Sequence, residues 1–237
     1  MGTWWDFPRT TRAWWDESDM LFVGYPSTKD DPQAVAARLA RYLPIFYPAL
    51  PDALLEVGNV RVRPTSDSEY DELYLVGHSL GGVILRRMVS ELAHEWELSG
   101  AATPVPTLLT GQLRFFAPAS AGFRAAGLLG FVKASPAWKA INLRLRMSSA
   151  YTDLQPGSSF LTETQRRTQD LVRAHTSALA SLRAYIVWAN PDDVVQPERY
   201  DSDHLTATVD GTSHSSVCKP HDRYQAPWLM VETGRPL

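Results

Sequence analysis

The chain is poor in cysteine, because Cys218 is the only one among its 237 residues. An intrachain disulfide is therefore impossible, and the composition favours a reducing compartment. We expect Cys218 to be a buried structural thiol and the protein to be cytoplasmic.

Long apolar runs and a strong charge of either sign are also missing. The longest mostly apolar stretches are shorter than the roughly 18 residues that a membrane span requires, so we expect no integral membrane segment. The N-terminal stretch MGTWWDFPRTTRAWWDESDM lacks the apolar region of a secretory signal. The formal net charge is −3, which indicates neither nucleic acid nor an anionic membrane as a partner.

Hydrophobic residues make up 44% and charged residues 21% of the chain, a balance typical of a globular protein. The length predicts a single domain over residues 1–237. Apolar runs alternate with helix-like stretches, which predicts an α/β fold with a mainly parallel sheet flanked by helices. The expected strands are 20–25, 73–76, 113–117, 184–189 and, more weakly, 205–209. The expected helices are 31–47, 81–97, 136–147 and 161–180.

One glycine-rich segment, Gly77-His78-Ser79-Leu80-Gly81, joins a predicted strand to a predicted helix. It fits the G-x-S-x-G pattern of a nucleophile elbow, a strained turn that holds a serine hydroxyl above the sheet edge. We expect glycine at the flanking positions because side chains there would collide with the strand and helix. The N–H of Leu80 is the predicted oxyanion donor. A nucleotide-binding turn is the alternative, but the segment lacks both G-x-G-x-x-G and a P-loop lysine.

An elbow serine needs an acid and a histidine that follow it in the chain. His214 is the main candidate because it lies in a loop of small residues just after the weak strand, where an imidazole can reach the sheet edge. The other downstream histidines are His94 and His175, both within predicted helices, and His204 and His221, which remain alternatives.

Two neighbouring aspartates, Asp192 and Asp193, follow Pro191 at the end of a predicted buried strand. Such a pair commonly forms a turn or a helix cap. Its place at a strand end before the histidine loop favours an acid that orients His214 and stabilises its charged form. The residues alone leave the choice between Asp192 and Asp193 open.

The order of Ser79, Asp192 and His214 resembles the lipase and esterase branch of the α/β-hydrolases. Further segments resemble one subgroup, which includes the serine-active-site-containing phospholipid-remodelling proteins and hydrolase modules beside bacterial signalling NTPases; GPI inositol deacylases are more distant. The matching segments cover almost the whole chain, and the histidine segment is more specific than the elbow. They are residues 2–8, 23–27, 76–82, 154–161 and 214–220.

The resemblance implies an α/β-hydrolase fold and a serine esterase that uses Ser79, His214 and an aspartate, without a cofactor or metal, on a small-molecule or lipid ester. In the family, the acid is followed by any residue and then two valine-like residues, which implies Asp192 rather than Asp193. The alternatives are a catalytically weakened or inactive interaction module and an acyltransferase.

The start of the chain departs from the family pattern. The family places a strand ending in His-Gly, whose loop gives the second oxyanion N–H, between the strand at 20–25 and the elbow strand. Met1 falls almost inside that loop, so two alternatives stay open: either the translation start lies upstream of Met1, or the sheet lacks its N-terminal strands. In the second case the N–H groups of residues 2–4 are candidate substitute donors.

Two other features carry expectations. Segment 119–151 lies where this fold inserts a cap or lid, and core packing is the alternative. The arginine pairs at 86–87 and 166–167 are expected on solvent-facing helix surfaces rather than at a phosphate site.

Overall fold

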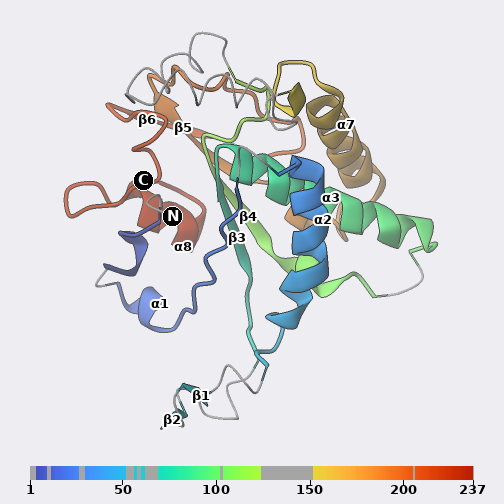
Figure 1. The fold of residues 1–237 in the computed structure, drawn as a ribbon, viewed down its shortest axis with the longest axis horizontal. Coiled ribbons are helices and arrows are strands. Elements are labelled where there is room, and N and C mark those ends of the chain that lie inside the picture. Colours follow the sequence, from blue (N-terminus) through green and yellow to red (C-terminus); the bar gives the residue numbers. More distant parts are fainter. Residues whose placement is uncertain are drawn as a thin grey trace.

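The structure is a computed structural model that describes residues 4–9, 12–26, 30–51, 56–57, 60–61, 69–101, 104–123, 152–204 and 206–236. The predicted helix at 136–147 lies outside the described residues, as do residues 124–151 of the predicted cap or lid at 119–151. The described part is a layered α/β architecture (Figure 1).

A four-stranded, all-parallel sheet with the order β3-β4-β5-β6 lies at the centre of the fold. Four predicted strands are thereby confirmed, with ends that differ by one or two residues. They are β3 (Tyr74–His78), β4 (Gln112–Phe116), β5 (Tyr185–Asn190) and β6 (Ala207–Asp210). The inner strands β4 and β5 are almost continuously buried, as expected when helices cover both faces of a parallel sheet. Two short antiparallel strands, β1 (Glu56–Val57) and β2 (Val60–Arg61), form a separate sheet.

Three predicted helices are confirmed, and they lie together on one side of the sheet: α2 (Pro32–Tyr42), α3 (Leu80–Leu98) and α7 (Ser159–Ala174) (Figure 1). The predicted ends of α2 at 47 and of α7 at 180 are wrong, because these helices end at Tyr42 and Ala174. The other side carries α1 (Ala13–Asp16) and α8 (Ala226–Thr233). The Asp31 carboxylate caps α2 by accepting from the N–H groups of Gln33 and Ala34, at 2.7 and 3.0 Å. Short 3-10 turns are η1 (Phe7–Arg9), η2 (Leu43–Ile45), η5 (Thr107–Thr110) and η6 (Ala180–Leu182).

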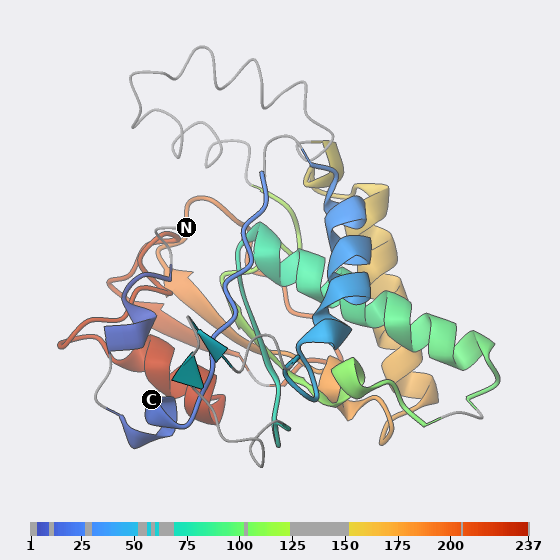
Figure 2. The same cartoon turned by 60° about the horizontal axis from the view of Figure 1, so that its bottom comes forward.

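The strand predicted at residues 20–25 is wrong. Residues 18–26 form an extended segment outside the sheet, and it runs beside β3 in the same direction (Figure 2). Within the described ranges, the parallel sheet ends at β3 on this side, so no neighbouring strand pairs with the segment. An apolar run becomes a strand only when a partner satisfies its backbone groups.

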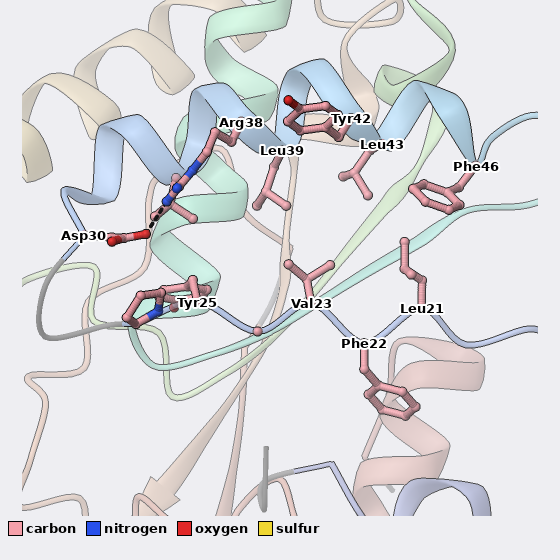
Figure 3. A pocket seen from close by; sticks show the side chains of 13 residues that line it. Leu21, Phe22, Val23, Tyr25, Asp30, Arg38, Leu39, Tyr42, Leu43 and Phe46 are labelled. Atoms are coloured by element: carbon pink, nitrogen blue, oxygen red, sulfur yellow. Dashed lines mark hydrogen bonds and ion pairs between the residues drawn. The ribbon is translucent and has the colours of Figure 1, made fainter.

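A groove of about 410 Å³ separates this extended segment from α2 (Figure 3). Leu39 of α2 and Leu43 of η2 point toward Leu21 and Val23, while Phe22 points the opposite way (Figure 3). This is the alternation of an extended chain. Leu21 and Phe22 remain 54% and 52% exposed. The apolar side chains of the segment are therefore only partly covered.

The arginine pair at 86–87 contradicts the expectation of a solvent-facing surface. Arg86 and Arg87 are only 1% and 3% exposed. The Arg86 guanidinium donates two hydrogen bonds, of 2.7 and 3.0 Å, to the buried carboxylate of Asp203. The side chain of Arg166, in contrast, is 67% exposed and pairs with Asp170 on α7. Arg86 thus has a long-range partner, which the sequence pattern alone does not reveal, whereas Arg87 donates to the local Glu91 at 2.8 Å.

Candidate active site

Ser79 lies alone between the last residue of β3 and the first residue of α3. Its backbone adopts φ 54° and ψ −124°, a conformation that non-glycine residues rarely occupy and that is found mainly at functional turns. The neighbouring strand end holds the turn in place. The Ser79 N–H donates to the Phe116 carbonyl at 3.1 Å, and the Ser79 carbonyl accepts from the N–H groups of Gly82 and Ala119, both at 3.2 Å.

Gly77 and Gly82 are the two glycines around this turn that are closely packed, whereas the expected pair was Gly77 and Gly81. A Cβ on Gly77 would lie 2.7 Å from the Gly82 backbone, so the strand and helix approach too closely for a side chain. A Cβ on Gly82 would lie 3.0 Å from Pro118. Gly81, the last glycine of the pattern, has only the Tyr25 hydroxyl nearby, at 3.7 Å, so the predicted collision there is wrong.

The structure brings His214 and Asp192 to Ser79 in a single hydrogen-bonded chain. His214 Nε2 lies 3.0 Å from Ser79 Oγ, and His214 Nδ1 lies 3.0 Å from Asp192 Oδ2. Because the carboxylate accepts at Nδ1, Nε2 of the neutral ring is left to accept from the serine hydroxyl. His214 and Asp192 are only 3% and 7% exposed, so water is largely kept away from the chain of contacts.

The parallel sheet explains how these distant residues meet. Ser79 follows β3, Asp192 follows β5, and His214 lies in the loop after β6. The carboxyl ends of parallel strands share one edge of the sheet, which is where ligands bind in open α/β folds.

Asp192, rather than Asp193, contacts the histidine. Its other oxygen, Oδ1, accepts from the N–H groups of Val194 and Val195, both at 3.0 Å, so the same side chain also forms the turn. Burial by itself would raise the pKa of Asp192, but the hydrogen bonds from His214 and from the two N–H groups outweigh it and lower that pKa. Asp193 is exposed.

The remaining candidate histidines lie elsewhere. His204 stacks on Tyr185 with ring centroids 3.9 Å apart, and His221 pairs with Tyr224 through backbone hydrogen bonds. The other two, His94 and His175, both contact Glu97.

The predicted oxyanion donors are placed only in part. Leu80 is the first residue of α3, so its N–H has no intrahelical carbonyl partner and can serve a ligand. Among the suggested substitute donors, residues 2 and 3 lie outside the described ranges. Trp4 is described, and its ring packs 6.2 Å from that of Phe116. The N-terminal segment therefore passes near the elbow.

Sequence reasoning missed one member of this cluster, His78. Its Nε2 lies 2.8 Å from the backbone carbonyl oxygen of His214, and the two rings are 4.8 Å apart. Burial, reinforced by charge on His214, lowers the pKa of His78 to about 4. The available signal was its position directly before the serine, and that position alone does not reveal the partner.

This lowered pKa predicts a pH-dependent stability. As the pH falls from His78's ordinary pKa of 6.5 to about 4, the unfolded chain binds a proton that the folded chain does not. His78 should therefore contribute stability above this window that is lost as the pH falls through it, about 3 kcal/mol in all. Urea unfolding of the wild type and of His78→Gln across this pH window measures this contribution. We expect the free energy of unfolding to depend less on pH in His78→Gln than in the wild type. An equal pH dependence in both proteins would contradict the assignment.

In the described part of the chain, no three histidine, cysteine, aspartate or glutamate side chains lie together in a way that suits a metal ion. None of the described helices combines the length and the apolar character of a membrane span. Cys218 is buried, as expected, and burial raises its pKa to about 12. A thiol that resists ionisation is a poor nucleophile.

Comparison with known proteins adds no relative: no family model matches the chain, and no curated protein or solved structure matches it. What is established is an α/β architecture with a parallel sheet, with Ser79, His214 and Asp192 in contact at one edge.

Proposed function

We propose that this protein is a serine hydrolase of the α/β-hydrolase fold that cleaves carboxylic esters, including lipid esters, through an acyl-enzyme. One observation carries the proposal. Ser79 Oγ, the His214 ring and the Asp192 carboxylate form a hydrogen-bonded chain with both links at 3.0 Å, and a strained elbow presents the serine.

The geometry supplies each step of ester cleavage. Ser79 Oγ attacks the carbonyl carbon while its proton moves to Nε2 of His214. Asp192 holds the ring through Nδ1 and stabilises the imidazolium without taking its proton. The Leu80 N–H stabilises the oxyanion, and the imidazolium returns the proton to the departing alcohol. Water then attacks the acyl-enzyme by the same route, which releases the acid and regenerates Ser79.

The strained backbone supports a reactive serine over an inactive interaction module. A residue held in a sparsely populated conformation costs on the order of 1–3 kcal/mol and persists only where the surroundings enforce it. Around Ser79, three backbone hydrogen bonds enforce it. An interaction module that had lost catalysis would gain nothing from this cost, nor from keeping the acid and imidazole aligned.

Labelling with a fluorophosphonate probe, followed by peptide mapping, tests the proposal. We expect the wild type to carry the label on Ser79 and Ser79→Ala to carry none. Ser215→Ala is a matched control because this exposed serine lies next to His214 in the chain, and it should label like the wild type. An unlabelled wild type, or a labelled Ser79→Ala, would refute the serine mechanism and favour the interaction module. Product analysis with competing alcohols then separates hydrolysis from acyl transfer.

A further inference from the structure

His78 is bound to the main chain of His214, not to its ring nitrogens. Its Nε2 is 2.8 Å from the His214 carbonyl oxygen, and the rings are inclined at 44° with centroids 4.8 Å apart. The ring nitrogens of His214 are occupied by Ser79 and Asp192. We propose that His78 is a positioning residue, a role that rests on the proposed function. It fixes the backbone of the histidine loop so that the His214 imidazole stays in line with Ser79.

The sheet order explains why such a contact matters. β3 and β6 are the two outermost strands of the described parallel sheet, and β4 and β5 lie between them. The loop after β6 must therefore carry His214 across the sheet edge to a serine that follows β3. A long loop holds a side chain precisely only if both of its ends, and the functional residue itself, are fixed to rigid elements.

Most hydrogen bonds around His214 remain within its own loop. Ser213 and Ser216 bond to each other through backbone and side chain. The hydroxyl of Tyr224 holds the Val217 carbonyl at 2.8 Å, and the Gly211 N–H donates to the carbonyl of Asn190 at the end of β5. These contacts organise the loop near β5, β6 and the C-terminal segment. The bond from His78 ties the main chain of His214 to β3, and among the described residues no other hydrogen bond of the His214 backbone reaches that strand.

The direction of this hydrogen bond determines the tautomer of the His78 ring. A carbonyl oxygen can only accept, so Nε2 of His78 must carry a hydrogen. The neutral ring therefore has its proton on Nε2, and this nitrogen has no lone pair left to take a proton from Ser79. The low pKa of about 4 keeps the ring uncharged near neutral pH. An uncharged neighbour adds no repulsion when His214 becomes an imidazolium during the reaction.

Two substitutions separate the donor from the ring volume. His78→Leu fills similar space without a donor, and we expect it to lower kcat for a p-nitrophenyl ester about 10- to 100-fold while KM changes less than about twofold. His78→Gln can place an amide N–H near the position of Nε2, and we expect it to recover most of the lost kcat. Unfolding midpoints at pH 7 control for stability, and fluorophosphonate labelling rates should follow kcat in both variants.

A nitrogen NMR measurement of the histidine rings examines the contact without turnover. We expect His78 to be neutral and protonated on Nε2 between about pH 5 and pH 8, given its lowered pKa. Wild-type kcat in His78→Leu, equally low kcat in both variants, or a proton on Nδ1 of His78 would overturn the positioning role while leaving the serine mechanism intact. An inactive, unlabelled wild type would instead overturn the proposed function, and the positioning role with it.

Discussion

Replacing Asp192 by asparagine should lower kcat for ester hydrolysis about 10⁴-fold with little change in KM. The contacts of the carboxylate give the reason. The asparagine oxygen would keep accepting from the N–H groups of Val194 and Val195, as Oδ1 does now. The amide nitrogen would then face Nδ1 of His214 and donate to it. The neutral ring would be forced to carry its proton on Nε2, where it cannot accept from Ser79.

The neighbouring aspartate provides the control for this experiment. Asp193→Asn removes one carboxylate charge at the next position, but Asp193 is exposed and His214 is bonded to Asp192. We expect kcat of Asp193→Asn to stay within about twofold of the wild type, since surface substitutions away from the site have small effects. Steady-state kinetics on both variants, with unfolding midpoints to check folding, decide the matter. A larger loss in Asp193→Asn than in Asp192→Asn would refute the assignment of the acid.

Asp203→Ala should lower the free energy of unfolding by about 3–5 kcal/mol, because it breaks a buried ion pair. Asp203 accepts two hydrogen bonds from Arg86 and one each from the backbone N–H groups of Ala184 and Tyr200. The guanidinium also lies 4.2 Å from the ring centroid of Tyr200 and 5.2 Å from that of Phe115. Removal of the carboxylate leaves a buried cation and two backbone donors without their partner.

Urea denaturation provides the measurement, and an exposed ion pair provides the matched control. Asp170→Ala removes a carboxylate that is 51% exposed and pairs with Arg166, so we expect a loss of less than about 1 kcal/mol. The double variant Arg86→Met/Asp203→Leu removes both charges, so no unpaired buried charge remains. Its loss in the free energy of unfolding should be smaller than that of Asp203→Ala. If Asp203→Ala cost no more than Asp170→Ala, the buried pair would have no special role in stability.

Local chemistry made much of the site predictable from sequence. The elbow is specified by glycines within a few residues of Ser79, and the acid follows a strand with an evident apolar run. The strand before His214 is a weaker signal. Parallel strands then bring their carboxyl ends to the same edge, so chain order largely predicts proximity.

The features that sequence reasoning missed depend on distant partners. The segment at 20–25 has the apolar pattern of a strand, but a strand also requires a neighbour, and a pattern cannot supply one. Arg86 is buried by a carboxylate 117 positions away in the chain. His78 is the variable residue of a motif, and its role arises from a carbonyl 136 positions later. In each case the decisive contact is set by the tertiary fold.

The separation of Ser79 and His214 along the chain has a consequence during protein synthesis. The ribosome adds the imidazole partner 135 residues after the serine. Under the proposed mechanism, the serine hydroxyl has no base until that point. Activation of Ser79 would therefore follow the synthesis of β6 and the docking of the loop that carries His214.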